Sequence, residues 1–109
     1  MRSRALAALN ALTEAEAHAH QIAPAEVHFH EVGAWDSIAD VVGVCAAVAD
    51  LGLTDLSCGV LGVGSGTHRA GHGEIPVPEP VPAVVQLALG WPVTAGGTGE
   101  LATPTGVAC

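Results

Sequence analysis

Two histidines and two aspartates recur at regular spacings within residues 27–43, VHFHEVGAWDSIADVVG. His28 and His30 are two apart, so on a strand both imidazoles face the same side. Asp36 and Asp40 are four apart, so on a helix both carboxylates share a face. Neutral imidazoles with a carboxylate suit Ni, Zn, Cu or Fe, whereas Mg and Ca prefer oxygen ligands alone. The pattern indicates a transition-metal site if the strand and the helix bring these two faces together.

A purely structural interpretation of the same residues stays open. Asp36 fits the N-cap of the helix, and Asp40 fits a solvated helix face. His28 fits a surface position on the strand. Spacing alone does not decide between a metal site and an ordinary capped helix beside a strand.

A second polar cluster is the glycine-rich segment 64–73, GSGTHRAGHG. The glycines that flank Ser65 free backbone N–H groups to approach an anion, and Arg69 is the one cation in the body of the chain. His68 and His72 are four apart, but the glycine between them disfavours a helical metal site. The spacing and the lysine of a P-loop are missing. The segment predicts either an anion site or a flexible hairpin.

A third cluster lies in residues 96–106, GGTGELATPTG. Thr103 followed by Pro104 is the typical start of a helix, with the threonine as N-cap and the proline at the first helical position. The hydroxyl of Thr105 lies just inside the same start. A helix start can also attract an anion through its unpaired N–H groups, so capping and anion binding are compatible here.

The surrounding elements must position these clusters. Leucines at near-helical spacing, alternating apolar residues and Gly or Pro breaks predict helices and short strands in alternation. In chain order we expect a helix over 3–21, a strand over 26–32, a helix from Asp36 to Gly52, a strand over 56–63, a loop or short hairpin over 64–82, a helix over about 81–89 and a short strand over 91–95. The prediction is an α/β or α+β fold, a small layered domain with a short mixed sheet and about three to four helices, in which residues 1–109 form a single domain.

Composition excludes several function classes. The chain has 109 residues, a net charge of −8, and Arg2, Arg4 and Arg69 as its only cations. Because no run of Lys or Arg could displace counterions, nucleic acid is excluded as a partner. No segment approaches the length of a membrane span, and acidic residues soon follow the N-terminal arginines, unlike in a signal peptide.

The cysteines point to a reducing compartment. Cys45, Cys58 and Cys109 are odd in number, widely spaced and form no CxxC pair. This pattern argues against a disulfide framework and fits the cytoplasm, where buried thiols behave as small apolar side chains. We therefore interpret the three cysteines as inert core residues.

Four separated motifs, taken in order, resemble one known family: HFHEVGAWDSIADVVG, GVLGVGSG, HGEIPVPEPVPAVVQLALGWPV and GELATPTGVA. They resemble the LarC family, the pyridinium-3,5-bisthiocarboxylic acid mononucleotide nickel insertion proteins. The resemblance covers nearly the whole chain from about Glu26 to Ala108. One departure is the turn PVPEPVP, in which Glu79 and Val81 stand where small residues are expected.

The resemblance implies a nickel chelatase, a cyclometallase of the lyase class, that completes the nickel-pincer nucleotide cofactor of lactate racemase. It implies nickel, a nucleotide-like small-molecule substrate, CTP with Mn or Mg in the full-length protein, and lactate racemase as a partner. Family members are several times longer. We therefore expect this chain to be a piece of the N-terminal half of such a protein, without the CTP site and inactive alone. A homo-oligomer stays open.

The resemblance also suggests roles for the matching residues. The implied metal ligands are His28, His30, Glu31, Asp36 and Asp40. The implied substrate-binding residues are Ser65, Arg69, Thr103 and Thr105. His30 or His72 could accept the proton that leaves the ring carbon when nickel binds it, because neutral imidazole is the usual base near pH 7.

Two other functions stay open. The first is a non-catalytic scaffold or oligomerisation domain whose polar motifs only shape turns. The second is a metal-storage module that would use His18 and His20, which we expect to be exposed at the end of the first helix, where they complement its dipole.

Overall fold

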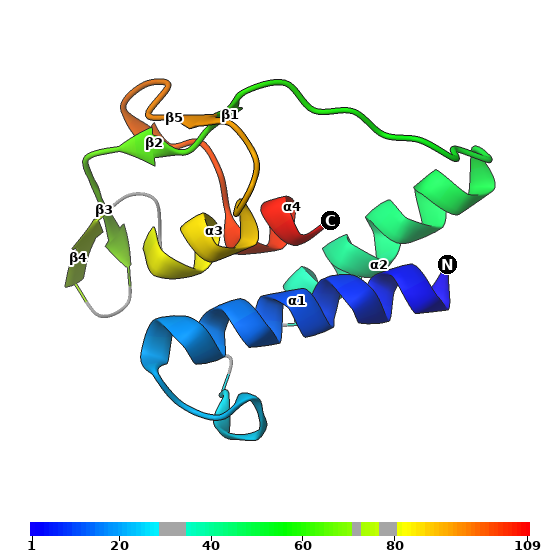
Figure 1. Ribbon diagram of the computed structural model, residues 1–109, viewed down its shortest axis with the longest axis horizontal. Coiled ribbons are helices and arrows are strands. Elements are labelled where there is room, and N and C mark those ends of the chain that lie inside the picture. The colour runs from blue at the N-terminus through cyan, green and yellow to red at the C-terminus, as the bar shows by residue number, and fades with distance from the viewer. Residues whose placement is uncertain (29–34, 71–72, 77–80) are drawn as a thin grey trace.

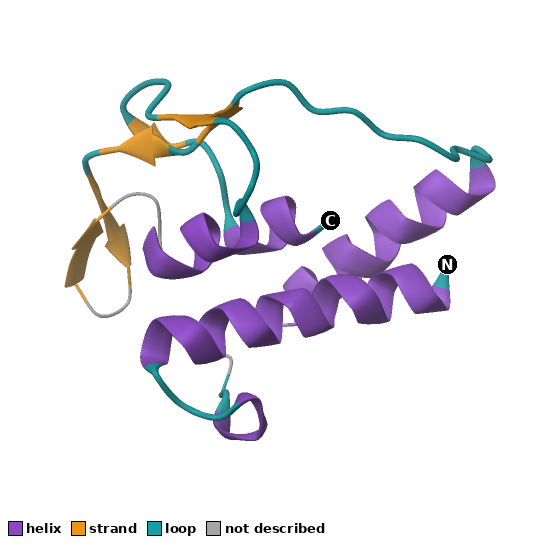
Figure 2. Cartoon of the chain, in the orientation of Figure 1, coloured by secondary structure: helices purple, strands orange, loops and turns teal. Residues whose placement is uncertain are grey.

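The computed structural model describes residues 1–28, 35–70, 73–76 and 81–109 of the chain. The helices are α1 (Arg2–His20), η1 (Pro24–Glu26, a 3₁₀ turn), α2 (Trp35–Asp50), α3 (Val81–Leu87) and α4 (Pro104–Ala108). The strands are β1 (Leu61–Gly62), β2 (Gly64–Ser65), β3 (Thr67–Ala70), β4 (Gly73–Pro76), β5 (Val93–Thr94) and β6 (Gly99–Glu100). Figure 2 shows the four α-helices packed together, with the 3₁₀ turn apart below them and the short strands gathered on the upper left.

Helix α1 confirms the helix predicted over 3–21. It is rich in alanine and leucine, which have the highest helix propensities. It ends where Gln21 adopts a left-handed conformation with φ of 54°, and the backbone N–H of Ile22 donates to the carbonyl of Ala17 at 3.0 Å. Helix α1 therefore begins and ends within one residue of the predicted bounds.

The core lies where α1 packs against α2, α3 and α4. Figure 1 shows α1 running beneath α3, with α2 crossing beside it. One buried cluster joins α1 to α2, and Leu9 and Ala108 pack against it; its members are Ala5, Ala8, Val41 and Cys45. These side chains are small, so the helix axes can approach closely. Among the described residues, the largest fully buried side chains are Leu12, Val41 and Val84.

The strands pair two by two. Within the described residues, β1 pairs with β5 in parallel, and the pairs β2–β6 and β3–β4 are antiparallel. The β3–β4 pairing, in which Ala70 lies opposite Gly73, confirms the hairpin alternative for residues 64–82. The helices, together with the parallel and antiparallel strand pairs, confirm the predicted small α/β or α+β domain. The helix predicted over about 81–89 is present as α3, and Gly90 follows it with φ of 84°.

Several local predictions were wrong. The strand expected over 26–32 is contradicted at its start, because Glu26 belongs to η1 and His28 lies in irregular structure; residues 29–32 lie outside the described residues. The strand expected over 56–63 shrinks to β1. The chain before it forms the long arch between α2 and β1 in Figure 1. Asp36 is not an N-cap, since α2 already includes Trp35.

Helix α4 starts as the sequence predicts. Thr103 is its N-cap and Pro104 its first residue, and the backbone N–H of Gly106 donates to Thr103 Oγ1 at 3.2 Å. Replacing Thr103 by alanine leaves that N–H without its acceptor. We expect the free energy of unfolding to fall by about 1 kcal/mol, measured by denaturant titration. Thr103→Ser is the matched control, because serine can make the same bond; an equal loss in both variants would contradict the capping role.

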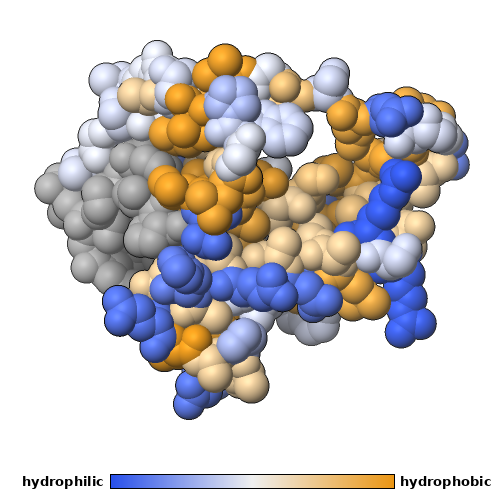
Figure 3. All heavy atoms as spheres, in the orientation of Figure 1, coloured by the Kyte–Doolittle hydropathy of each residue, from blue (hydrophilic) through white to orange (hydrophobic). Residues whose placement is uncertain are grey.

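Many large apolar side chains remain at the surface. Trp35 is 88% exposed and Leu51 is 70% exposed. In Figure 3 the apolar residues gather around the short strands, whereas hydrophilic residues run along the lower part of the view, where α1 lies. Among the described residues, no helix is both long and apolar enough to cross a membrane.

Candidate functional site

An open hollow of about 590 Å³ lies between α2 and α4. We call it the α2–α4 hollow. Its polar wall residues are Asp40 from α2 and Thr103, Thr105 and Cys109 from the segment of α4. The two threonines lie more than sixty positions from Asp40 in the sequence, so only the packing of α2 against α4 brings these side chains together.

Small residues keep the hollow open. On α2 its wall includes Ala39 and Gly43, and a Cβ added at Gly43 would meet no atom within 4 Å. On the other wall, the Oγ1 atoms of Thr103 and Thr105 are 3.4 Å apart, a long hydrogen bond in which either hydroxyl could be the donor. Because Thr103 Oγ1 already accepts from Gly106, the hydroxyl of Thr105 is the more available of the two for a bound molecule.

Cys109 also lines the hollow, a position that the sequence did not predict. Partial desolvation at the wall of the hollow raises the pKa of the Cys109 thiol, and the nearby Cys45 and Asp40 raise that pKa further, since a thiolate there would lose some of its hydration and be repelled by negative charge. The sequence predicts that all three cysteines are core residues. Cys45 is buried, but Cys58 and Cys109 are exposed, so that interpretation was wrong for these two. Their isolated positions in the sequence gave no signal of this.

The raised pKa of Cys109 has a measurable consequence. At a given pH below it, the folded chain holds less reactive thiolate than the unfolded chain. We expect the alkylation rate of Cys109 to rise with pH at a more alkaline midpoint in the folded chain than in denaturant, measured by mass spectrometry after pulses of iodoacetamide. Identical midpoints in both states would contradict the shift.

The raised pKa of Cys109 also determines how its titration changes the free energy of unfolding with pH. The folded state favours the protonated thiol, so this contribution is fully present below the unfolded pKa and is lost as the pH rises through the folded pKa. Stability should therefore fall on the alkaline side of the ordinary thiol range. Cys109→Ser removes the titrating group and should flatten that part of the profile.

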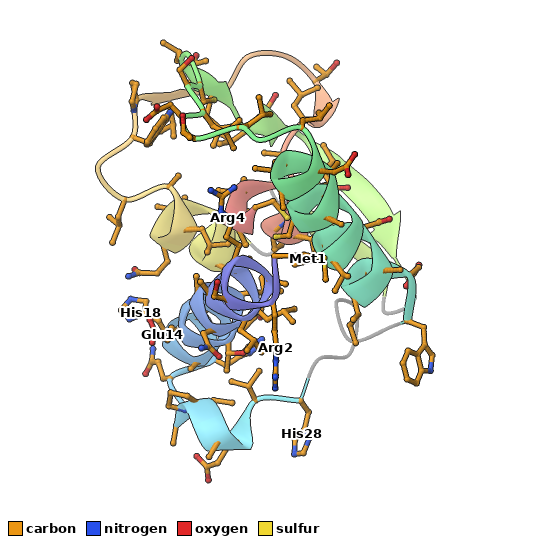
Figure 4. All side chains as sticks on the ribbon, turned by 90° about the vertical axis from the view of Figure 1, so that its right-hand side faces the viewer. Met1, Arg2, Arg4, Glu14, His18 and His28 are labelled. Atoms are coloured by element: carbon orange, nitrogen blue, oxygen red, sulfur yellow. The ribbon has the colours of Figure 1, made fainter. Side chains whose placement is uncertain are left out.

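The predicted metal ligands are only partly described. Asp36 and Asp40 are exposed on α2, and Asp36 Oδ1 accepts from the backbone N–H of Ser37 at 2.9 Å. His28 is exposed on the segment after η1 and points away from the helices in Figure 4. His30 and Glu31 lie outside the described residues.

The described residues do not form a complete metal site. Within them, no three side chains of His, Cys, Asp or Glu gather closely enough to hold an ion. A site that uses Asp40 therefore requires further ligands, either from the predicted residues outside the described part of the chain or from the bound molecule. The predicted ligand set stays a prediction.

The predicted anion-binding residues of the glycine-rich segment lie on two different short strands where the structure describes them. Ser65 lies in β2, and its hydroxyl donates to the carbonyl of Gly97 at 2.8 Å, which ties β2 to the turn before β6. Arg69 lies in β3, paired in register with Glu74 of β4. His72 lies outside the described residues. The structure thus places Ser65 and Arg69 on consecutive short strands, and Ser65 is not among the residues that line the α2–α4 hollow.

His18 and His20 are exposed at the end of α1, as predicted. Residues two apart on a helix point in different directions, so one ion cannot bind both imidazoles. Glu14 and His18 line another open hollow and lie close together in Figure 4, whereas His20 Nε2 is 3.4 Å from a carboxylate oxygen of the buried Glu16. This geometry does not favour a storage site built on both histidines.

Comparison with known proteins decides the family. The family model described as "Nickel insertion protein" matches residues 1–109, the whole chain. The chain belongs to the nickel insertion protein family. The resemblance read from the four sequence motifs is thereby confirmed. No solved structure matches the chain.

Curated relatives agree with this assignment. A protein of Nocardioides named pyridinium-3,5-bisthiocarboxylic acid mononucleotide nickel insertion protein is 48% identical over 109 residues, covering 99% of this chain and 27% of that protein. Proteins of Synechocystis and Myxococcus xanthus, both provisionally named nickel insertion proteins, are 49% and 45% identical, covering 94% and 98% of this chain and 25% and 27% of their own lengths. The chain thus spans about a quarter of the length of the curated relatives it matches.

Proposed function

We propose that this chain binds nickel and a pyridinium mononucleotide, as part of a longer protein that inserts nickel into pyridinium-3,5-bisthiocarboxylic acid mononucleotide. The observation that supports this most is the α2–α4 hollow. A residue predicted to bind the metal, Asp40, and two predicted to bind the substrate, Thr103 and Thr105, line the same hollow. Metal insertion requires such proximity, because the ion must pass from protein ligands to the substrate.

Nickel is the cargo in this proposal. The proposed ligands are the nitrogen and oxygen donors His28, His30, Glu31, Asp36 and Asp40. Donors of this borderline kind hold Ni²⁺ without trapping it, so the sulfur atoms of the substrate can take it over. The bound mononucleotide would supply the ligands that the described residues lack around Asp40.

The substrate offers a phosphate and two thiocarboxylates. Thr105 and Arg69 would bind these groups through hydroxyl and guanidinium donors, with Ser65 and Thr103 contributing from positions that the fold already fixes. When nickel binds the ring carbon, the proton of that carbon must leave. We assign its acceptance to His30 or His72, because a neutral imidazole can take a proton near pH 7.

The longer protein would then act as a nickel chelatase, a cyclometallase of the lyase class. Its product would be the nickel-pincer cofactor of lactate racemase, which is the proposed partner. CTP with Mn or Mg would bind to polypeptide outside residues 1–109, so this chain alone would bind its ligands without completing the reaction. We place this activity in the cytoplasm, in keeping with three free cysteines.

The test is calorimetric titration of Ni²⁺ into the chain in the presence of the pyridinium mononucleotide. Asp40→Asn removes a charged ligand and should weaken nickel binding about tenfold. Asp50→Asn is the matched control, because Asp50 is an exposed aspartate at the other end of the same helix. It should leave the affinity unchanged.

Equal affinities in the Asp40 variant, the Asp50 variant and the unchanged chain would contradict the proposed site. The same result would favour the alternative, a non-catalytic scaffold. That alternative makes its own prediction: a longer protein of the family should keep its full insertion activity after His30→Ala together with Asp36→Ala.

A further inference from the structure

Two thiols meet in a second hollow of the molecule. Cys45 of α2 and Cys109, which follows α4, both line a hollow of about 380 Å³ whose remaining wall comes from α1, α2, Ala108 of α4 and the segment from Leu53 to Leu56. We call it the thiol hollow. Most of its wall is apolar. Arg4 also lines it, and both of its terminal guanidinium nitrogens donate to the carbonyl oxygen of Leu53 at 3.5 Å.

Packing places both cysteines on the wall of this one hollow. Ala108 packs against the buried cluster that contains Cys45, so the next residue, Cys109, is placed beside that cluster. Helices α2 and α4 are in contact. The effect of Cys45 on the titration of Cys109 agrees with this proximity. Both cysteines are free, Cys45 is buried and Cys109 is exposed.

We propose that Cys45 and Cys109 form a reversible intramolecular disulfide when the chain meets a low-molecular-weight disulfide such as oxidised glutathione. The exposed Cys109 thiol gives up its proton and its sulfur attacks one sulfur of the oxidant, so that the S–S bond of the oxidant breaks, a mixed disulfide forms and one glutathione leaves as the thiol. Cys45 then loses its proton, and its sulfur attacks the Cys109 sulfur, releasing the second glutathione thiol. Two S–H bonds are lost, one S–S bond forms, and the oxidant is reduced to two thiols.

The bond would join α2 directly to the end of α4. These elements also form the walls of the α2–α4 hollow, which Cys109 itself borders. Oxidation would therefore fix the spacing between Asp40 and Thr105. In a reducing compartment such a disulfide is transient and reports the redox state. Formation of the bond is independent of the proposed nickel function.

Digestion with trypsin can identify which cysteines of the chain are linked. Trypsin can cut only after Arg2, Arg4 and Arg69, because the chain has three basic residues and no lysine. Cleavage after Arg69 separates residues 5–69, which hold Cys45 and Cys58, from residues 70–109, which hold Cys109. The Cys58→Ser variant leaves one cysteine on each piece, so a covalent link between the pieces identifies the proposed bond.

The experiment oxidises Cys58→Ser with oxidised glutathione, blocks remaining thiols with N-ethylmaleimide in denaturant, and digests with trypsin. We expect a monomer that has lost two hydrogens, takes up no maleimide, and yields the two pieces linked until a reductant is added. The unchanged chain should show the same link and one maleimide, on Cys58. This second measurement does not depend on the folding of a variant.

Two outcomes would overturn the proposal. One is a glutathione adduct on Cys109 with Cys45 still taking up maleimide, because it shows that Cys45 cannot reach its neighbour. The other is a link found only in disulfide-joined dimers on a non-reducing gel.

Discussion

Replacing both His28 and His30 by alanine is expected to weaken nickel binding by the chain roughly a hundredfold, because the change removes two of the proposed imidazole ligands. Calorimetric titration with Ni²⁺ measures the loss directly. A competition with a coloured chelator extends the range if the unchanged chain binds tightly. His28 is exposed, so its replacement should cost the fold little and the affinity can be compared at equal folded fractions.

The matched control is the double variant His18→Ala with His20→Ala. It removes the same number of imidazoles from an exposed helix end, and it should leave nickel affinity unchanged. If this control loses affinity while the His28 and His30 variant keeps it, the histidines at the end of α1 hold the ion. That result would contradict the proposed ligands and favour a storage module.

The second large effect concerns the core. Leu12 is 1% exposed on α1, the helix that packs against α2, α3 and α4. Replacing it by alanine removes buried apolar atoms and leaves a cavity. We expect the free energy of unfolding to fall by about 2–5 kcal/mol, measured by urea titration with circular dichroism. Such a loss is a large share of the stability of a small domain.

Leu6 provides the control for that change. It lies on the same helix but is 49% exposed, so Leu6→Ala removes the same atoms at a site already in contact with water. Its cost should be well under half of the cost at Leu12. Equal losses at the two positions would show that α1 does not pack in the way described.

The helices could be predicted because their signals are local. Alanine and leucine favour α1, Gly52 adopts φ of 66° just after α2, and Thr103 with Pro104 starts α4. Each of these features depends on residues within one or two turns of the chain. The three predictions were therefore correct to within a few residues.

The strands were harder because pairing depends on distant partners. Around Glu26 the alternating pattern suggested a strand, but the carboxylate of Glu26 accepts from the backbone N–H of Ala23 at 3.0 Å and closes a 3₁₀ turn instead. Before β1, alternating apolar residues find no partner strand among the described residues. Only Leu61 and Gly62 pair, opposite Val93 and Thr94.

In the candidate site, too, local features could be predicted from the sequence and the packing of distant residues could not. Spacing predicted that Asp36 and Asp40 share a helix face and that Thr103 caps a helix. It could not predict that Asp40 and Thr105 would line one hollow, because that follows from the packing of α2 against α4. The exposed position of Cys109 beside Cys45 was missed for the same reason.

The central claim is that nickel and the mononucleotide meet in the α2–α4 hollow. Paramagnetic Ni²⁺ broadens the amide signals of nearby residues, so a ¹⁵N–¹H spectrum of the chain with one equivalent of Ni²⁺ and the mononucleotide tests it directly. We predict that the signals of Asp40, Gly43, Thr105 and Gly106 broaden, while those of His18 and His20 stay sharp. Sharp signals around the hollow, with broadening confined to the end of α1 or spread evenly over the surface, would contradict the account.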